Sequence, residues 1–134
     1  MRIIDATRRR RSGRTPVVIA TDVLALRRLD HGGLVIETGL TYDGLAPVRV
    51  HVTKREGRFL FSDEGGAVSA AAPASQPAFE RRIVLGDRDV NVSRRGVVFV
   101  PAVASSSDEW LLELVGLVAE GSLALYEALL ELDD

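Results

Sequence analysis

The alternation of apolar and polar residues in the middle of the chain predicts antiparallel strands. Residues 47–54, PVRVHVTK, place three valines on one side and polar side chains on the other, the period of two that is typical of a half-buried strand. Residues 34–42, LVIETGLTY, are rich in β-branched side chains and precede Asp43-Gly44, a common hairpin turn. Together with residues 58–63, RFLFSD, these segments predict a three-stranded meander.

Two further strands are expected after a segment of small residues. Residues 64–80 are mostly small and nearly uncharged, so we expect a loop with one helical turn at 67–72. Residues 81–93 and 96–102 have the composition of two short strands, and an Arg-Arg-Gly turn joins them. The sequence therefore predicts an antiparallel sheet of about five strands.

Periodicity predicts a long C-terminal helix. Residues 105–107 are three serines, which are preferred at helix N-caps. Beyond them nearly every residue is apolar, apart from acidic residues at the start and a set of glutamates that fall on one narrow stripe at 100° per residue. These are Glu109, Glu113, Glu120, Glu127 and Glu131. A helix of this kind backing an antiparallel sheet gives an α+β fold.

The apolar part of this helix is wider than the face of about 100° that a single sheet would cover. Part of the helix is therefore expected to meet a second surface, either a helix from the N-terminal part of the chain or the seam of a homodimer. A break at Gly121-Ser122 into two shorter helices is a further alternative. The residues expected at a dimer seam are Trp110, Leu114, Leu117, Leu125 and Leu129.

The 134 residues are enough for one domain. We expect residues 1–16 to form a basic, disordered arm and residues 17–134 to form a single α+β domain. Apolar spacing followed by His-Gly-Gly predicts a helix over 18–30. The alternative for this segment is a short strand at 16–20 followed by a shorter helix.

The formal net charge of −2 conceals an uneven distribution of charge. Residues 1–14 carry six arginines and one aspartate, whereas residues 107–134 carry eight carboxylates and no lysine or arginine. The part between them is close to neutral. The chain therefore has a basic beginning and an acidic end.

The basic cluster RRRRSGR at 8–14 suits either a nucleic-acid contact or a solvated tail. Arginines that neutralise phosphates give a salt-dependent affinity that ignores sequence. The acidic body would repel the same phosphates, and the few aromatic residues supply no evident stacking platform. Nucleic acid therefore stays an alternative partner, and its expected contacts are Arg8, Arg9, Arg10, Arg11 and Arg14.

Asp63 and Glu64 are the candidates for metal chemistry, because they follow a strand and adjacent carboxylates can hold Mg²⁺. A metal-dependent hydrolase would need them to converge with a residue such as Lys54. Consecutive strand residues point to opposite faces, however. An aspartate before Gly-Gly more often forms a turn by accepting local backbone hydrogen bonds, and this is the interpretation that we favour.

The chain has no cysteine, no HExxH motif and no phosphate-binding glycine pattern. We therefore predict no catalytic residue, no metal site and no cofactor. No apolar run approaches the ~20 residues of a membrane span, and a chain without cysteine fits a reducing compartment. The expected location is the cytoplasm, with no membrane contact.

Residues 59–71, FLFSDEGGAVSAA, resemble the hallmark of a bacterial and phage family known as domain of unknown function 1828. In that family a strand ends in a Leu-Ser/Thr-Asp-Asp-Gly pattern before a short apolar segment. Phe61 interrupts the pattern here, and a glutamate replaces its second aspartate. The resemblance implies a fold outline over residues 33–131 and no catalytic residues. The matching positions are Leu60, Ser62, Asp63, Glu64 and Gly65.

The order of elements is also similar to that of the small acidic chaperones of type III secretion, an analogy of topology that implies a dimeric protein-binding module. The sequence thus predicts a non-enzymatic binding or adaptor protein, dimeric, that contacts an unidentified protein through the polar face or an edge strand of its sheet. One alternative is a nucleic-acid-associated protein that uses the arginine arm, for which the family resemblance implies a connection to phage. The other is a metal-dependent hydrolase.

Overall fold

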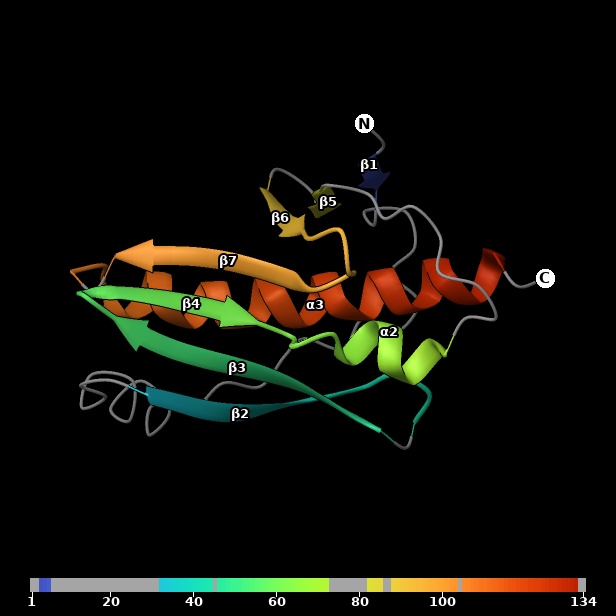
Figure 1. The fold of residues 1–134 in the computed structure, drawn as a ribbon, viewed down its shortest axis with the longest axis horizontal. Helices are drawn as coiled ribbons and strands as arrows, with labels where there is room; N and C mark the ends of the chain where they lie inside the picture. Colours follow the sequence, from blue (N-terminus) through green and yellow to red (C-terminus); the bar gives the residue numbers. More distant parts are fainter. Residues whose placement is uncertain are drawn as a thin grey trace.

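The computed structural model describes residues 3–5, 32–44, 46–72, 82–85, 88–103 and 105–132. Within these ranges the chain forms one seven-stranded sheet and two helices, which are labelled in Figure 1. The strands are β1 (Ile3–Asp5), β2 (Gly32–Thr41), β3 (Pro47–Arg55), β4 (Arg58–Ser62), β5 (Arg82–Leu85), β6 (Arg88–Val92) and β7 (Val98–Val103). The helices are α2 (Gly66–Ala71) and α3 (Asp108–Leu132).

The strands lie in the order β1-β5-β6-β7-β4-β3-β2. β1 pairs with β5 in parallel, and all other neighbours are antiparallel. Figure 1 views the sheet with α3 behind it, running along β7 and β4, and with α2 beside the helix. This is an α+β fold in two layers, as the sequence predicts.

The meander, the helical turn after it and the long C-terminal helix are confirmed, but the sheet has more strands than the five expected. Residues 82–92 form two paired strands, because Leu85 and Arg88 are register partners and only Gly86 and Asp87 separate them. A Gly-Asp pair is a hairpin signal that the sequence reading overlooked. The seventh strand, β1, comes from three residues of the expected arm. The helix predicted over 18–30 lies outside the described residues.

The core lies between the sheet and α3. Val48, Val50 and Val52 of β3 are fully buried and face α3 together with Phe61 of β4, which confirms the period of two. α3 packs tightly against the sheet at Gly121, where a Cβ atom would lie 2.6 Å from Cγ2 of Val90 and would overlap it. The glycine is therefore required by packing, and α3 continues through it without the break considered above.

The apolar circumference of α3 is mostly covered within one chain. Of the residues expected at a dimer seam, Leu114, Leu117, Leu125 and Leu129 belong to the core, and each has 8% or less of its surface exposed. Trp110 is 39% exposed. The sheet and α2 both pack against α3, so the width of its apolar face no longer argues for a dimer. Neither described helix is long and apolar enough to cross a bilayer.

Candidate binding surfaces

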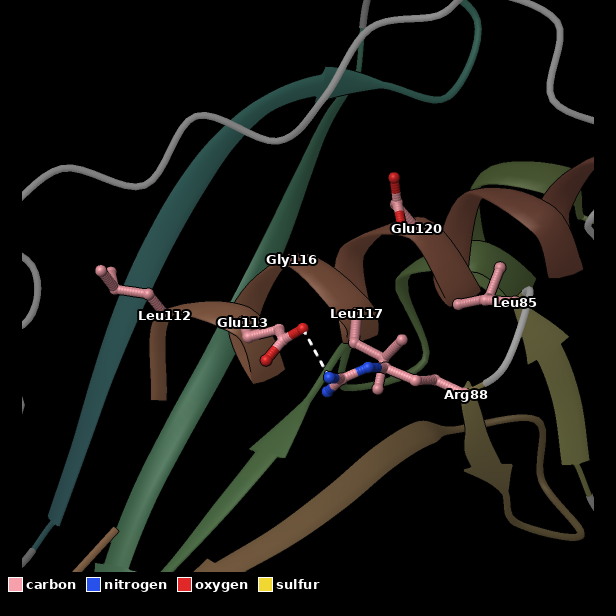
Figure 2. A pocket seen from close by; sticks show the side chains of 7 residues that line it. All are labelled: Leu85, Arg88, Leu112, Glu113, Gly116, Leu117 and Glu120. Atoms are coloured by element: carbon pink, nitrogen blue, oxygen red, sulfur yellow. Dashed lines mark ion pairs between the residues drawn. The ribbon is translucent and has the colours of Figure 1, made fainter. Parts of the chain in front are cut away.

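A groove runs between α3 and the ends of β5 and β6, with a volume of about 400 Å³ (Figure 2). Arg88 crosses it: Nη2 lies 2.9 Å from Oε1 of Glu113, and the guanidinium carbon lies 4.8 Å from the centre of the Trp110 ring. Nη1 of Arg88 is buried and has no hydrogen-bond partner among the residues that the structure describes. The groove is lined by Leu85, Arg88, Leu112, Glu113, Gly116, Leu117 and Glu120.

The lining of this groove mixes two carboxylates with one guanidinium and an apolar floor. The ion pair and the stacking on Trp110 hold Arg88 in place, as charge-assisted hydrogen bonds and cation–π contacts do. Their evident role is to fasten the β5–β6 hairpin to the first turns of α3. The sequence reading missed this contact, because nothing local to Arg88 indicates a partner on the last helix.

Asp63 occupies a buried junction at the end of β4, with only 2% of its surface exposed. Oδ1 accepts hydrogen bonds from the backbone N–H groups of Gly65 and Val98, both at 2.9 Å. Oδ2 accepts from the N–H of Ala67 at 3.3 Å and from the hydroxyl of Ser122 at 2.7 Å. One side chain thereby ties β4 to β7, α2 and α3.

Tyr42 completes this Asp63 junction. Its hydroxyl lies 2.7 Å from Oγ of Ser122, and because the serine proton goes to Asp63, the tyrosine is the donor. Burial raises the pKa of Tyr42 to about 12; the hydrogen bond to Ser122 opposes this shift, and the nearby charge of Asp63 adds to it. A Cβ atom at Gly66 would lie 2.6 Å from the tyrosine oxygen. The second glycine of the Asp-Glu-Gly-Gly segment therefore makes room for this hydroxyl.

The geometry of Asp63 is that of a structural anchor. Four donors already point at its two oxygens, so a cation in the same place would face N–H groups instead of oxygen ligands. Glu64 is exposed and adopts a left-handed conformation, and Lys54 pairs with Phe59 at the other end of β4. The described residues contain no group of three potential metal ligands. The three residues of the hydrolase hypothesis are not brought together.

The face of the sheet opposite α3, called the open face below, is not covered by any other described element. Val35, Leu60 and Val103 project from it with 50%, 40% and 53% of their surfaces exposed, and they are three of the five large apolar side chains that are exposed among the described residues. The open face of β2, β3, β4 and β7 carries Val35, Glu37, Arg49, His51, Thr53, Arg55, Arg58, Leu60, Phe99, Pro101 and Val103.

Charges on the open face are unevenly paired. Arg49 forms an ion pair at 3.2 Å with Glu37 on the neighbouring β2. Arg55 and Arg58 are directly opposite each other across β3 and β4, both are exposed, and neither forms an ion pair with a described residue. Like charges at directly opposite positions destabilise a sheet. Arg49, Arg55 and Arg58 therefore all lie on the open face.

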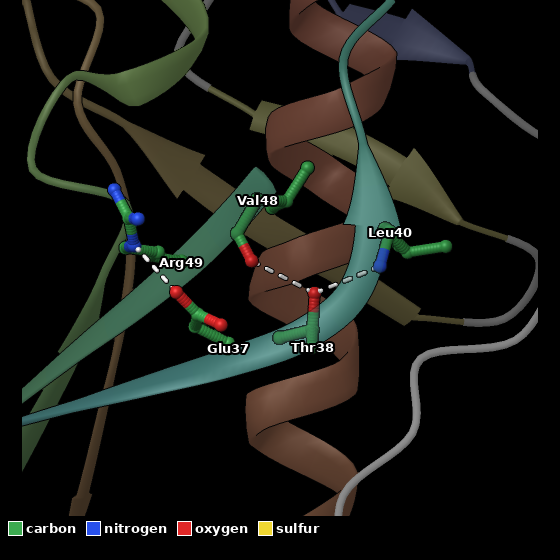
Figure 3. Close-up of polar contacts among 5 residues, drawn as sticks. All are labelled: Glu37, Thr38, Leu40, Val48 and Arg49. Carbon is green, nitrogen blue, oxygen red and sulfur yellow. Dashed lines mark hydrogen bonds and ion pairs between the residues drawn. The ribbon is translucent and has the colours of Figure 1, made fainter. Parts of the chain in front are cut away.

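Near Arg49, β2 contains a bulge, shown in Figure 3. The buried Thr38 hydroxyl donates to the carbonyl of Val48 at 2.9 Å and accepts from the N–H of Leu40 at 3.4 Å. Gly39 has a φ of 80°, a conformation that favours glycine. The bulge bends β2 between Glu37 and Thr41, so the regular open face ends there.

The arginines proposed for nucleic-acid contact, at positions 8–11 and 14, lie outside the described residues. No protein-family model matches the chain, and neither the curated proteins nor the solved structures include a match. The resemblance to domain of unknown function 1828 therefore stays a prediction. The most informative positions of its pattern here are Asp63 and Gly65, because the N–H group of Gly65 donates to Oδ1 of Asp63.

Proposed function

We propose that this protein is a non-enzymatic binding module that recognises another protein through the open face of its sheet. The observation that carries the proposal is the juxtaposition of two directly opposed arginines, which form no ion pair with a described residue, with exposed apolar residues. Arg58 is the register partner of Val103 and lies two positions from Leu60 on the same side of β4. An exposed apolar patch beside uncompensated charge is typical of an interaction surface.

The composition of the open face favours a protein partner over nucleic acid. Arg49 is already neutralised by Glu37, and Arg82 on β5 by Asp89 at 3.1 Å. Of the arginines described on the open face, Arg55 and Arg58 are left for phosphates. The large apolar residues that it exposes, Val35, Leu60 and Val103, are all aliphatic, and Phe99, the aromatic residue among its described positions, is half-buried. Nucleic-acid sites instead need several phosphate contacts or aromatic stacking platforms.

The experiment compares two leucines that are equally exposed on opposite sides of the molecule. Leu60 lies on the open face and Leu130 lies on α3, with 40% and 42% of their surfaces exposed. A photo-crosslinking amino acid is placed at one or the other position in the native host. We expect a discrete protein adduct from position 60 alone, lost when Val103→Asp is added.

The partner identified in this way is then purified and titrated with the unlabelled chain. A protein that uses the open face should bind the Val103→Asp variant at least ten-fold more weakly than the wild type, because the substitution removes apolar contact surface and places a carboxylate opposite Arg58, whose charge it would neutralise. Identical adducts from positions 60 and 130, or a partner indifferent to Val103→Asp, would overturn the proposal. Light scattering of the same samples measures whether the partner is a second copy of the chain.

A further inference from the structure

The exposed apolar residues of the open face lie on a diagonal that crosses strands. Register partners on neighbouring strands form rows across the sheet. Val35 on β2 lies in the row of His51 and Ser62, and Leu60 on β4 lies in the next row of the same face. Val103 on β7 lies in the row after that. Strands are about 4.8 Å apart and alternate residues about 6.8 Å apart, which makes the diagonal about 20 Å long. An added edge strand would touch β2 alone and could not reach all three residues.

An element that lies across four strands and is about 20 Å long matches an α-helix of about 13 residues. The same molecule contains an example of such packing, since α3 lays its apolar side on the other face of the sheet. The charges of α3 are also instructive. Its described residues carry Asp108 and five glutamates with no basic residue, and one of these glutamates, Glu113, forms an ion pair with Arg88 of the sheet.

Arg55 and Arg58 flank the diagonal at its Val103 end. Two exposed cations placed opposite each other, without an ion pair to any described residue, are complementary to carboxylates on a partner. Resting on the function proposed above, we infer that the open face binds an amphipathic helix of another protein, whose apolar side covers Val35, Leu60 and Val103 and whose acidic flank contacts Arg55 and Arg58.

Two helical peptides of about 16 residues test this inference. Both present the same leucine face, one flanked by glutamates and the other by lysines, and a single-stranded DNA of similar length serves as a third probe. Fluorescence anisotropy with the full chain should give at least a ten-fold lower Kd for the glutamate peptide than for the lysine peptide. Leu60→Asp should weaken binding of both peptides.

Charge reversal locates the contact. In the double variant Arg55→Glu/Arg58→Glu the preference should invert, so that the lysine peptide binds more tightly. The matched control is Arg94→Glu/Arg95→Glu, which makes the same change of net charge in the exposed turn between β6 and β7 and should leave the preference for the glutamate peptide unchanged. Inversion in both double variants would mean a general charge effect and overturn the inference.

The outcomes also separate this inference from the function on which it rests. Equal affinity for both peptides, or no binding of either, overturns the inference that the partner is an acidic amphipathic helix. The binding function still stands in that case if crosslinking at position 60 yields a partner sensitive to Val103→Asp. If the DNA binds more tightly than either peptide, and this binding is lost in Arg55→Glu/Arg58→Glu, both the helix inference and the proposed protein-binding function are overturned.

Discussion

The Asp63 junction and the pair of Arg55 and Arg58 differ in whether their charged groups have partners within the described chain. At the junction a buried carboxylate accepts four hydrogen bonds. At the open face two guanidinium groups lie opposite each other, without an ion pair to a described residue. The first arrangement is needed because an unmatched buried charge would destabilise the fold by several kcal/mol, roughly 3–5. The second is tolerated because water screens exposed charges, whose interactions are worth only about 0.2–1 kcal/mol.

The difference separates what the fold requires from what it can offer to a partner. Positions where every polar group is satisfied within the chain contribute to stability and have little left for recognition. Exposed positions with an unfavourable pair of charges lower the free energy of unfolding only slightly, and their side chains remain available to bind a partner. Substitutions at the two regions should therefore change different quantities, namely the free energy of unfolding at the junction and the partner affinity at the open face.

Removing the central carboxylate should have the largest effect. Asp63→Ala leaves the N–H groups of Gly65, Ala67 and Val98 without an acceptor, so the free energy of unfolding should fall by about 3 kcal/mol or more. Urea denaturation followed by circular dichroism measures this. The control is Glu64→Ala, which removes the adjacent, exposed carboxylate and should change stability by about 0.5 kcal/mol or less. Equal losses in the two variants would contradict the structural role of Asp63.

A smaller loss is expected where α3 meets the core side of the sheet. Gly121→Ala forces a methyl group against Val90 and Val98, which should lower the free energy of unfolding by about 1–3 kcal/mol. The matched control is Gly33→Ala on the open face, where the nearest atom would be 3.7 Å away and the change should stay within about 0.5 kcal/mol. Thermal denaturation of both variants makes the comparison. A tolerated Gly121→Ala would mean that α3 can move away from the sheet.

Alkaline pH should weaken the junction through Tyr42. Its pKa is raised from 10.0 to about 12 in the folded chain, so the unfolded state ionises first. The stabilising contribution is complete below pH 10 and is lost between pH 10 and 12, with a slope of at most about 1.4 kcal/mol per pH unit. Tyr42→Phe should remove this part of the slope and, by losing one hydrogen bond, cost about 1 kcal/mol at neutral pH. Denaturation curves with the same pH dependence for both proteins would refute the assignment.

The smallest effect on stability is expected at the open face. Here the test is whether the free energy of unfolding rises or falls. Arg58→Glu replaces a repulsive cross-strand pair with an attractive one, which should raise the free energy of unfolding by about 0.3–1 kcal/mol. Arg49→Glu, the control, places a second carboxylate opposite Glu37 and should lower it by a similar amount. A variant Arg58→Glu that is less stable than the wild type would show that Arg58 has a structural partner.

The meander strands β2, β3 and β4 and the helix α3 could be predicted from sequence because their signals are local. Alternating valines mark β3, and nearly unbroken apolar residues with spaced glutamates mark α3, whatever the rest of the chain does. The Asp63 junction was predicted only as a turn. Its hydrogen bonds to Val98 and Ser122 join residues that are 35 and 59 positions apart, and no periodicity links such residues.

The candidate surface was predicted in outline and not in detail. Alternation in β3 indicates that Arg49, His51 and Thr53 share a polar face, but the opposition of Arg55 and Arg58 depends on the register of β3 with β4. That register follows from the tight Glu56-Gly57 turn, in which both residues have positive φ. The apolar width of α3 pointed to a dimer because the sequence does not reveal that α2 and the sheet together cover it.

The bulge at Thr38 and Gly39 has a consequence for edge-to-edge association between molecules of this protein in concentrated solution. Among the described strands, β2 has a hydrogen-bonded neighbour on one side only, and a straight ten-residue border of this kind would invite strand-by-strand growth into fibrils. The bend interrupts that border, so an incoming strand would leave backbone amides unmatched after a few residues. A single threonine–glycine kink thereby gives the protein a built-in resistance to aggregation.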